Sequence, residues 1–536
     1  MSRWSSHDRG IERRRTRRAV LIGAAMVAVT LAGAVTTATA ETALVTAIKK
    51  QDRRAALALI RQRTPVRQTE PDGTTPLHWA VEVDDVELVR ALLQAGATNA
   101  PNRYGTTPLE LAAENGNPRV IDALLQGGAD AKTATPEGET VLMTASRTGN
   151  VEAMRLLLAR GADPNAQERW FGETALMWAA AENHSDAVRL LLEAGATADL
   201  AGKKMEFARK VAGQTSLPVG SMTPLMYAAR SGALAAAEAL VDGGANLNVQ
   251  DPDGMTATIL AVINGHYDVA ALFIEKGANP NLTDSSGMAA LYATVDMHTL
   301  PFMHGRPYPK ASGKVSIEDM VEVLLTHGAD ANQKLKTPLL RRHNSSSTQS
   351  LGEGTTPLLR AAASGDVTLM RALLKHGADP TLKQKNGNTM LMLASGFGRR
   401  GDHNADALEF EKGTPEELLR AVKVCVEELE LDPNTANEQG DTALHVAHSG
   451  DIVKYLAAHG ANVDAKNKRG QTPLGIALSR TDRSSRQLRP DVVAALKDLG
   501  GNPGTPAGEP AKAAAPPATT EPAKAGAATP RSSATP

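Results

Sequence analysis

The chain of 536 residues has one cysteine, few aromatic residues and almost no net charge. The single thiol, Cys425, excludes an intramolecular disulfide. Aromatic residues make up 3% of the chain although 42% of it is hydrophobic, so we expect a core of Ala, Leu, Val and Met. The 58 basic and 59 acidic residues argue against a surface that coats nucleic acid. The length is too great for one compact core and indicates several domains or a repeat array.

Motifs for catalysis are also missing. The sequence contains no H-E-x-x-H, G-x-S-x-G or paired C-x-x-C pattern. Residues 396–401 match G-x-G-x-x-G, but they follow an expected helix, whereas a dinucleotide site needs strand, turn and helix in that order. Cys425 falls on an apolar helix stripe and is interpreted as a buried small hydrophobic residue. We therefore predict no catalytic residue, no cofactor and no metal site, in a protein that is not an enzyme.

The first 40 residues have the pattern of an export signal. Seven arginines precede residue 19, residues 19–40 carry no charge, and Ala38-Thr39-Ala40 forms a small-residue cleavage site. Thr16-Arg17-Arg18 is similar to part of a twin-arginine signal, and an arginine-rich Sec signal is the alternative. The pattern predicts a periplasmic or secreted bacterial protein with no membrane span once the signal is removed.

From residue 41 onward, one phrase recurs at a nearly constant interval. Its copies include DGTTPLHWAVEVDDVELVRALLQAGAT, YGTTPLELAAENGNPRVIDALLQGGAD and EGETVLMTASRTGNVEAMRLLLARGADPN. The threonine of the phrase stands at positions 75, 107, 140, 174, 223, 256, 356, 389, 442 and 472, with Ala289 in its place once. Most uninterrupted spacings are 32 to 34 residues. The phrase predicts a glycine turn, a threonine cap, a first helix, a leucine-rich second helix and a closing glycine.

This period, together with the pattern G-x-T-P-L-H-x-A, resembles the ankyrin-repeat family. The resemblance covers residues 41–503, with eleven copies and an N-terminal half-copy. It implies an all-α solenoid of helix-turn-helix repeats with β-hairpin-type fingers between them. His78 and His445, which stand in TPLH-like steps, are interpreted as structural hydrogen-bonding residues of the turn rather than as ligands.

Breaks in the spacing predict four insertions. Those near 199–220 and 335–353 lie between repeats, where fingers are expected. Those near 297–315 and 396–413 lie between the two helices of one repeat. The second helix then restarts at a capping sequence, which is Ser316-Ile317-Glu318-Asp319 in one case and Thr414-Pro415-Glu416-Glu417 in the other.

The insertion near 297–315 begins with MHTLPFMHGRPYP and allows three interpretations. It is a rim loop that packs Phe302 and Tyr308 against helix ends, or it is a recognition loop. The third interpretation is a copper site, because thioether and imidazole suit copper, although no cysteine or close carboxylate completes the set. Its ligands would be Met297, His298, Met303 and His304. The stretch also resembles inserts in exported bacterial ankyrin-repeat proteins, a resemblance that implies no activity.

Large aromatic residues at two predicted finger tips are the candidates for partner binding. Tyr104 precedes Gly105, and Trp170-Phe171 precede Gly172. An exposed aromatic residue there has a solubility cost without a structural return. The alternative is that Trp170 and Phe171 fold inward, because that repeat is one residue longer. With the insertion included, the predicted contact residues are Arg103, Tyr104, Arg169, Trp170, Phe171, Phe302 and Tyr308.

The sequence thus predicts an exported, monomeric scaffold that binds a protein partner through its concave face and inserted loops. The alternatives are an enzyme or metal-handling protein whose chemistry lies in the insertions, and a structural component of the envelope. Residues 504–536 contain seven prolines and little to bury, which predicts a disordered tail.

Overall fold

The computed structural model describes residues 42–205, 219–299, 313–337, 351–396, 413–479 and 489–504. These residues form twelve helix pairs, a short π-helix, η2 (Val424–Glu428), that directly follows α21, and one short two-stranded hairpin. The predicted signal peptide, nearly all of the tail, and Phe302, Met303, His304 and Tyr308 lie outside the described residues. The predictions made for them therefore remain predictions.

Each pair consists of a first and a second helix. The first helices are α2 (Ala43–Lys49), α4 (Pro76–Glu82), α6 (Pro108–Asn115), α8 (Val141–Thr148), α10 (Ala175–Ala181), α12 (Pro224–Ser231), α14 (Ala257–Ile263), α16 (Ala290–Thr299), α18 (Pro357–Ala363), α20 (Met390–Ala394), α22 (Ala443–Val446) and α24 (Pro473–Ser479). The second helices are α3 (Arg53–Arg61), α5 (Val86–Gln94), α7 (Pro118–Gln126), α9 (Val151–Ala159), α11 (Ser185–Glu193), α13 (Leu234–Asp242), α15 (Tyr267–Glu275), α17 (Ile317–Thr326), α19 (Val367–Lys375), α21 (Pro415–Lys423), α23 (Gly450–Ala458) and α25 (Pro490–Asp498). Repeats are numbered from the α4–α5 pair.

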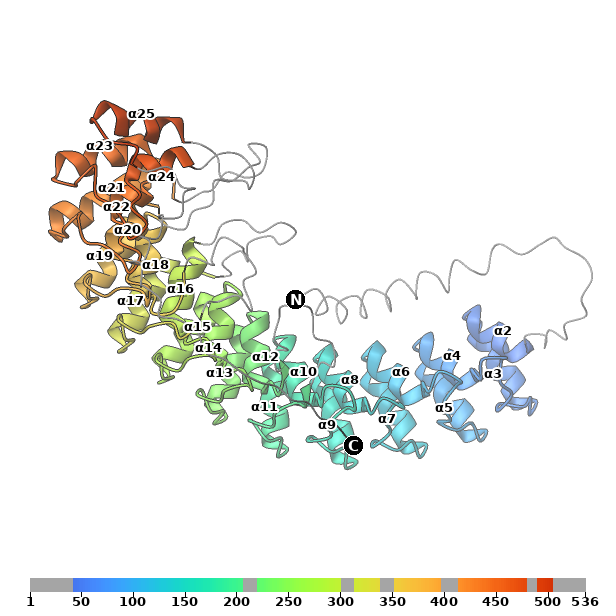
Figure 1. Ribbon diagram of the computed structural model, residues 1–536. Coiled ribbons are helices and arrows are strands. Elements are labelled where there is room, and N and C mark those ends of the chain that lie inside the picture. The colour runs from blue at the N-terminus through green and yellow to red at the C-terminus, as the bar shows by residue number, and fades with distance from the viewer. Residues whose placement is uncertain are drawn as a thin grey trace, which may run out of the picture.

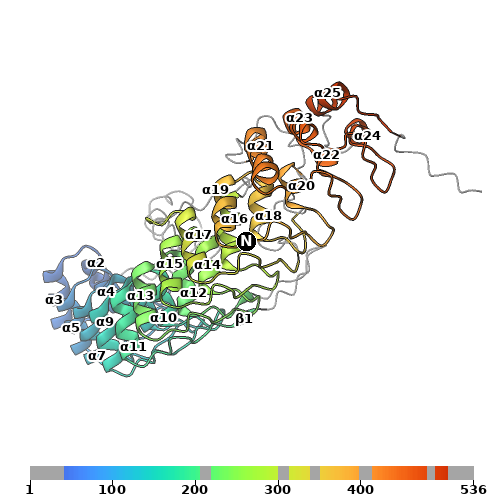
Figure 2. The ribbon, with the colours of Figure 1, turned by 90° about the vertical axis from the view of Figure 1, so that its left-hand side faces the viewer.

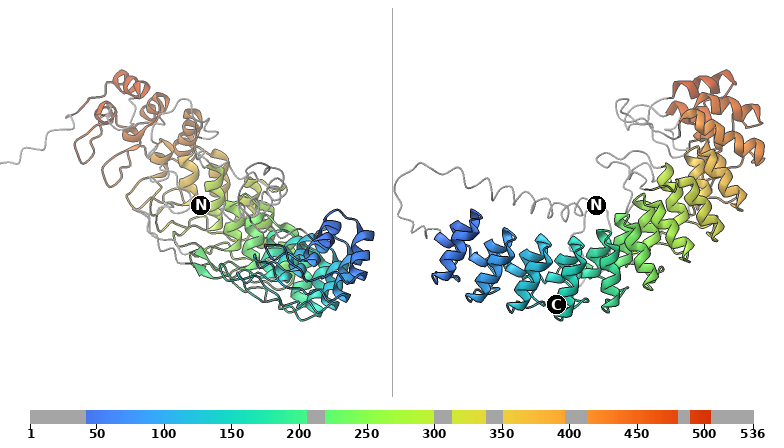
Figure 3. Two further views of the ribbon diagram at one scale, coloured as in Figure 1. Left: turned by 90° about the vertical axis from the view of Figure 1, so that its right-hand side faces the viewer. Right: turned by 180° about the vertical axis from the view of Figure 1, so that it is seen from behind.

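The pairs stack side by side into a curved array that runs from α2 at one end to α25 at the other (Figure 1). The first helices line the inner side of the arc, and most second helices lie on its outer side, as the view from behind also shows (Figure 3). Buried Ala, Leu, Val, Ile and Met side chains form one continuous core between the two layers. Each repeat therefore buries its apolar face against its neighbours, which confirms the predicted all-α solenoid.

The threonines begin the first helices as the sequence predicts. The Thr75 hydroxyl accepts a hydrogen bond from the His78 N–H, and Thr107 caps α6 in the same way. Proline occupies the first turn of α4 and α6, where its missing N–H breaks no helical bond. Most second helices end before glycines with positive φ, for example +83° at Gly161, as the predicted glycine cap requires, whereas Arg63 and Glu430 take this backbone angle after α3 and after the helical segment that follows α21.

Two predicted restarts of second helices are confirmed. Ser316 caps α17 and forms a capping box with Asp319. Thr414 caps α21, Pro415 occupies its first turn, and Glu417 completes the box. Both boxes satisfy N–H groups that have no partner within their helix.

Two sequence boundaries need correction, and one expected finger is confirmed. The predicted N-terminal half-copy is a complete pair, α2 and α3, whose second helix is followed by Arg63 at a φ of +60° instead of by a closing glycine. The insertion near 297–315 begins later, because α16 continues to Thr299 and includes Met297 and His298. The finger expected near 199–220 is confirmed, because β1 (Lys204–Met205) pairs there antiparallel with β2 (Val219–Gly220).

Candidate protein-binding surface

The fingers, which are the loops that precede each first helix, project from one edge of the array (Figure 2). Backbone hydrogen bonds connect neighbouring fingers. Arg103 N donates to Asp72 O at 2.8 Å, Arg169 N donates to Glu137 O at 2.8 Å, and Lys203 N donates to Phe171 O at 2.6 Å. Similar bonds recur as far as Lys468 N, which donates to Gln439 O. These bonds hold most finger tips in a row. The Tyr104 finger and the finger after it lack such a bond, because Pro136 has no N–H, and they approach each other closely at Gly105 and Pro136.

The Tyr104 finger is organised by one amide side chain. Asn102 Oδ1 accepts hydrogen bonds from Tyr104 N at 3.0 Å and from Thr106 N at 3.1 Å. Gly105 has a φ of +81° at the turn, and a Cβ there would lie 2.8 Å from Pro136 Cδ in the next finger. Glycine is thus required both by the backbone angle and by the close approach of the two fingers.

The Trp170 finger is one residue longer and has a longer side chain at its centre. The Glu168 carboxylate accepts hydrogen bonds from the backbone N–H groups of Trp170, Phe171 and Glu173. Glu168 is buried, so the three N–H groups compensate its desolvation. The longer glutamate side chain reaches across this wider loop, just as the shorter asparagine side chain reaches across the Tyr104 finger.

The tips expose the aromatic side chains that the sequence singles out. The exposed fractions are 76% for Tyr104, 68% for Trp170 and 41% for Phe171. Among the described residues, these three exceed the other exposed large hydrophobic residues, Leu234 and Leu499. The alternative that Trp170 and Phe171 fold inward is therefore wrong. Arg103 and Arg169 are exposed beside them.

The inner helices add aromatic residues that the sequence reasoning missed. Trp79 on α4 is half-buried, and its Nε1–H donates to Glu70 Oε2 at 2.7 Å. The Lys49 ammonium forms an ion pair with the other Glu70 oxygen at 2.7 Å and lies 4.2 Å from the Trp79 ring centroid. This contact has the geometry of a cation–π interaction.

A second aromatic group surrounds the buried Glu173 carboxylate. Trp178 Nε1–H donates to it at 2.9 Å, and the Tyr227 hydroxyl donates to it at 2.6 Å. Burial, followed by the Glu173 charge, raises the pKa of Tyr227 well above its usual value. The guanidinium groups of Arg147 and Arg230 lie 5.1 Å and 4.8 Å from the Trp178 and Tyr227 ring centroids.

These inner aromatic residues share one position in the repeat. Trp79, Trp178 and Tyr227 each stand four residues after the capping threonine of their own repeat. The finger leads into the first helix at that threonine, so the position faces the base of the fingers. Comparing the fourth position across repeats would have found all three residues. Together with the finger tips, the half-buried Trp79 and Trp178 form the aromatic surface of repeats one to five, whereas Tyr227 is buried and contributes through its hydrogen bond to Glu173.

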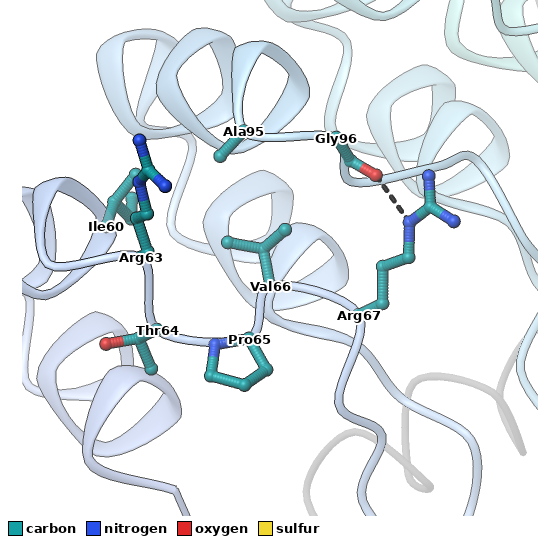
Figure 4. A pocket seen from close by; sticks show the side chains of 8 residues that line it. All are labelled: Ile60, Arg63, Thr64, Pro65, Val66, Arg67, Ala95 and Gly96. Atoms are coloured by element: carbon teal, nitrogen blue, oxygen red, sulfur yellow. Dashed lines mark hydrogen bonds between the residues drawn. The ribbon is translucent and has the colours of Figure 1, made fainter.

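Other features of the described chain offer no chemistry of their own. An open hollow near the first repeat is lined by Ile60, Arg63, Thr64, Pro65, Val66, Arg67, Ala95 and Gly96 (Figure 4). Its lining contains no His, Cys, Asp or Glu, and Arg67 Nε donates to Gly96 O at 2.6 Å. Burial raises the pKa of Cys425 to about 12, which keeps it a thiol at neutral pH.

His298, one of the residues considered for copper, instead connects three helices. Its Nδ1 lies 2.6 Å from Asp366 Oδ2, and its Nε2 lies 3.2 Å from Glu318 Oε1. In the described part of the chain, no group of three or more His, Cys, Asp or Glu side chains is placed to hold a metal ion. In the same part, none of the helices has the length and apolar character to cross a membrane.

These features define a solenoid of helix-turn-helix repeats with a braced row of fingers. The family model for ankyrin repeats (three copies) matches residues 44–135, 109–201, 207–284, 311–405 and 416–503. The chain belongs to the ankyrin-repeat family. Ankyrin repeats generally mediate protein–protein interaction, and the fold is typically that of a scaffold without enzymatic activity.

Similar proteins come from varied animals. The chain is 28% identical over 173 residues to alpha-latrocrustotoxin-Lt1a of Latrodectus tredecimguttatus, which covers 32% of this chain and 10% of the toxin. It is 30% identical over 211 residues to the mouse ankyrin repeat and SOCS box protein 16, covering 34% of this chain and 43% of that protein. The human ASB11 ankyrin repeat domain aligns in full with 45% of this chain at 26% identity and a TM-score of 0.37. Each of these two curated relatives is thus matched over less than half of its length.

Proposed function

We propose that this chain is an exported scaffold that binds a protein partner through the aromatic surface of repeats one to five. The observation that carries the proposal is the exposure of Tyr104, Trp170 and Phe171 on fingers whose backbones are braced by Asn102 and Glu168. Binding hot spots need large, rigid side chains on a firm base, and aromatic residues satisfy this need at low entropic cost.

Export is the second part of the proposal. The first described helix begins at Ala43 and is capped by Thr42, two residues beyond the expected cleavage after Ala40. Cleavage at that point would leave the first helix pair whole. We propose a monomer in the periplasm or outside the cell, and no observation favours an enzyme or an envelope component over this scaffold.

The test replaces the two most exposed aromatic residues together. Tyr104→Ala with Trp170→Ala is expected to abolish partner capture by crosslinking from the exported fraction, because two anchors are lost. The melting temperature should barely change, since both side chains are mostly exposed. Leu234→Ala with Leu499→Ala is the matched control, because these leucines are 40% exposed elsewhere on the array. Retained capture by the aromatic variant, or equal loss in the control, would refute the proposal.

A further inference from the structure

The tips of fingers two to four and the described start of finger five expose more positive than negative charge. Arg103, Arg169, Lys203 and Lys204 are exposed there, and we call these four residues the basic finger edge. Among the described residues of these tips, Glu137 is the exposed carboxylate. Glu168 and Glu173 are buried, and their oxygens accept hydrogen bonds from backbone N–H groups and aromatic donors. The charge that meets a partner is therefore mainly positive.

The edge is also regular in space. The backbone bonds from Arg103 N to Asp72 O, from Arg169 N to Glu137 O and from Lys203 N to Phe171 O fix fingers two, four and five against the finger before each of them. Packed helices lie about 8–10 Å apart, so neighbouring fingers repeat at about that distance. An extended polypeptide in the polyproline II conformation has three residues per turn and rises about 3.1 Å per residue, so every third side chain faces the same way and recurs about every 9 Å. An extended segment can therefore place one side chain at each finger.

We propose that the partner contributes an extended, acidic polypeptide segment. Its carboxylates contact the basic finger edge, and its apolar side chains pack against Tyr104 and Trp170. This inference rests on the proposed function and names the chemistry of the partner at the same surface. Opposite charge at such a surface increases the association rate and selects the partner.

The exposed carboxylate of Glu137 indicates which class of anionic partner fits this surface: a polypeptide, or a polymer that carries a charge on every unit. It is exposed between the fingers of Arg103 and Arg169, so a nucleic acid or a uniformly charged polysaccharide would bring an anion against it. A polypeptide avoids this repulsion, because a neutral residue can face Glu137 while acidic residues face the arginines. The arrangement therefore favours an acidic protein segment.

The experiment uses the full chain and a labelled peptide, Glu-Leu-Ser-Gln-Leu-Ser-Glu-Leu-Ser-Glu-Leu-Ser, which offers a carboxylate to fingers two, four and five and a neutral glutamine to Glu137 of finger three. Binding is measured by fluorescence anisotropy at low salt, with (Gln-Leu-Ser)4 as the uncharged probe. We expect the glutamate peptide to bind and the glutamine peptide to fail. The variant R103E/R169E/K204E should weaken binding about tenfold or more, because three attractive contacts become repulsive.

The matched control is K466E/K468E/R469E, which makes the same change of charge on the exposed finger of repeat eleven. It should leave binding of the glutamate peptide within about twofold, because screened charges at that distance act weakly. Circular dichroism should show that both variants are folded.

Three outcomes overturn the inference. The first is that the glutamate peptide does not bind. The second is equal weakening by both charge variants, which would indicate attraction to net charge alone. The third is tighter binding of a labelled oligo-dT or heparin with loss in the edge variant, which would identify a different class of ligand. If the glutamate peptide fails while Tyr104→Ala with Trp170→Ala still abolishes partner capture, the proposed function stands and the acidic segment is excluded.

Discussion

At the scale of single residues, the histidines of the TPLH step connect one repeat to the next. His78 Nδ1 accepts a hydrogen bond from Thr75 N at 3.1 Å, and its Nε2 lies 3.0 Å from Thr106 O in the following finger. His445 repeats the arrangement with Thr442 N at 3.0 Å and Gln471 O at 3.1 Å. Only the neutral ring, with its proton on Nε2, makes both bonds. The structural role predicted for both residues is confirmed.

These contacts predict that acid destabilises the array. Burial lowers the pKa of His78 and of His445, so the unfolded chain binds a proton more readily than the folded protein. The two neutral histidines contribute fully to the free energy of unfolding at pH values above the unfolded pKa of about 6.5. This contribution is lost as the pH falls toward the lowered pKa of the folded protein. Urea unfolding at pH 7.5 and at pH 5 measures the decrease in the free energy of unfolding.

The control for this prediction is His445→Gln, which has no group that titrates in this range. It should cost about 1 kcal/mol of stability at pH 7.5, because a bridging hydrogen bond is weakened. The difference in the free energy of unfolding between pH 7.5 and pH 5 should be smaller in the variant than in the parent protein. An equal difference would show that other groups control the acid response.

At the scale of elements, the ends of the insertion in repeat seven are attached to neighbouring helices. His298, near the end of α16, contacts Asp366 and Glu318. On the other side, Asp268 of α15 accepts hydrogen bonds from Lys314 N at 3.0 Å and Val315 N at 2.8 Å. The insertion is therefore bounded by anchored residues rather than by free loop ends.

This anchoring predicts that two similar deletions behave differently. Replacing residues 300–312 with a short Gly-Ser linker should leave helicity and the unfolding midpoint nearly unchanged, because both anchors remain. Deleting residues 298–313, which sequence boundaries alone suggest, removes His298 and should cost about 1–3 kcal/mol, because Asp366 is left buried without it. Circular dichroism and urea titration compare the two. Equal stability would show that the His298 contacts contribute little.

At the scale of the whole molecule, one buried ion pair connects repeats seven and eight. Arg360 Nε on α18 donates to Asp296 Oδ1 on α16 at 2.6 Å, and both side chains are almost fully buried. A second insertion, near 335–353, separates these repeats in the sequence. The ion pair therefore joins two halves of the array across a break in its period.

Removing one charge of this pair should weaken the contact between repeats seven and eight, so that the two halves of the array unfold less cooperatively. Asp296→Ala is expected to cost about 3–5 kcal/mol, because it leaves a buried guanidinium without its carboxylate. Asp296→Leu combined with Arg360→Met should cost less, since neither charge remains buried. Hydrogen exchange of the amides in repeats seven and eight measures the stability of both the single and the double variant. A double variant that is as unstable as the single one would contradict this account.

Export is also a property of the whole chain. Replacing Arg17-Arg18 with Lys-Lys should block export if the twin-arginine route is used, because that route reads the arginine pair. Normal processing in the variant would indicate the Sec route. In either case, N-terminal sequencing of the exported parent protein should begin near Glu41. An uncleaved chain in the membrane fraction would refute the signal peptide.

The sequence by itself determined the repeat and its fold. The threonine caps, the first-turn prolines and the glycines with positive φ are local requirements, because each is satisfied within a few residues of chain. Their period therefore predicted the helix pairs, the capped restarts at Ser316 and Thr414, and the burial of Cys425. The pair α2–α3 was missed because it has no finger turn to mark it.

Only the tertiary structure decided which side chains meet. Nothing local shows that Trp178 and Tyr227, from different repeats, share the carboxylate of Glu173. Nothing local shows that Asp296 pairs with Arg360, or that His298 contacts Asp366. Trp170 could have turned inward on sequence grounds, and the buried Glu168 carboxylate holds its finger with the ring exposed. The contacts from Tyr227 to Glu173, from Asp296 to Arg360 and from His298 to Asp366 depend on the stacking of repeats, which brings together residues that are dozens of positions apart.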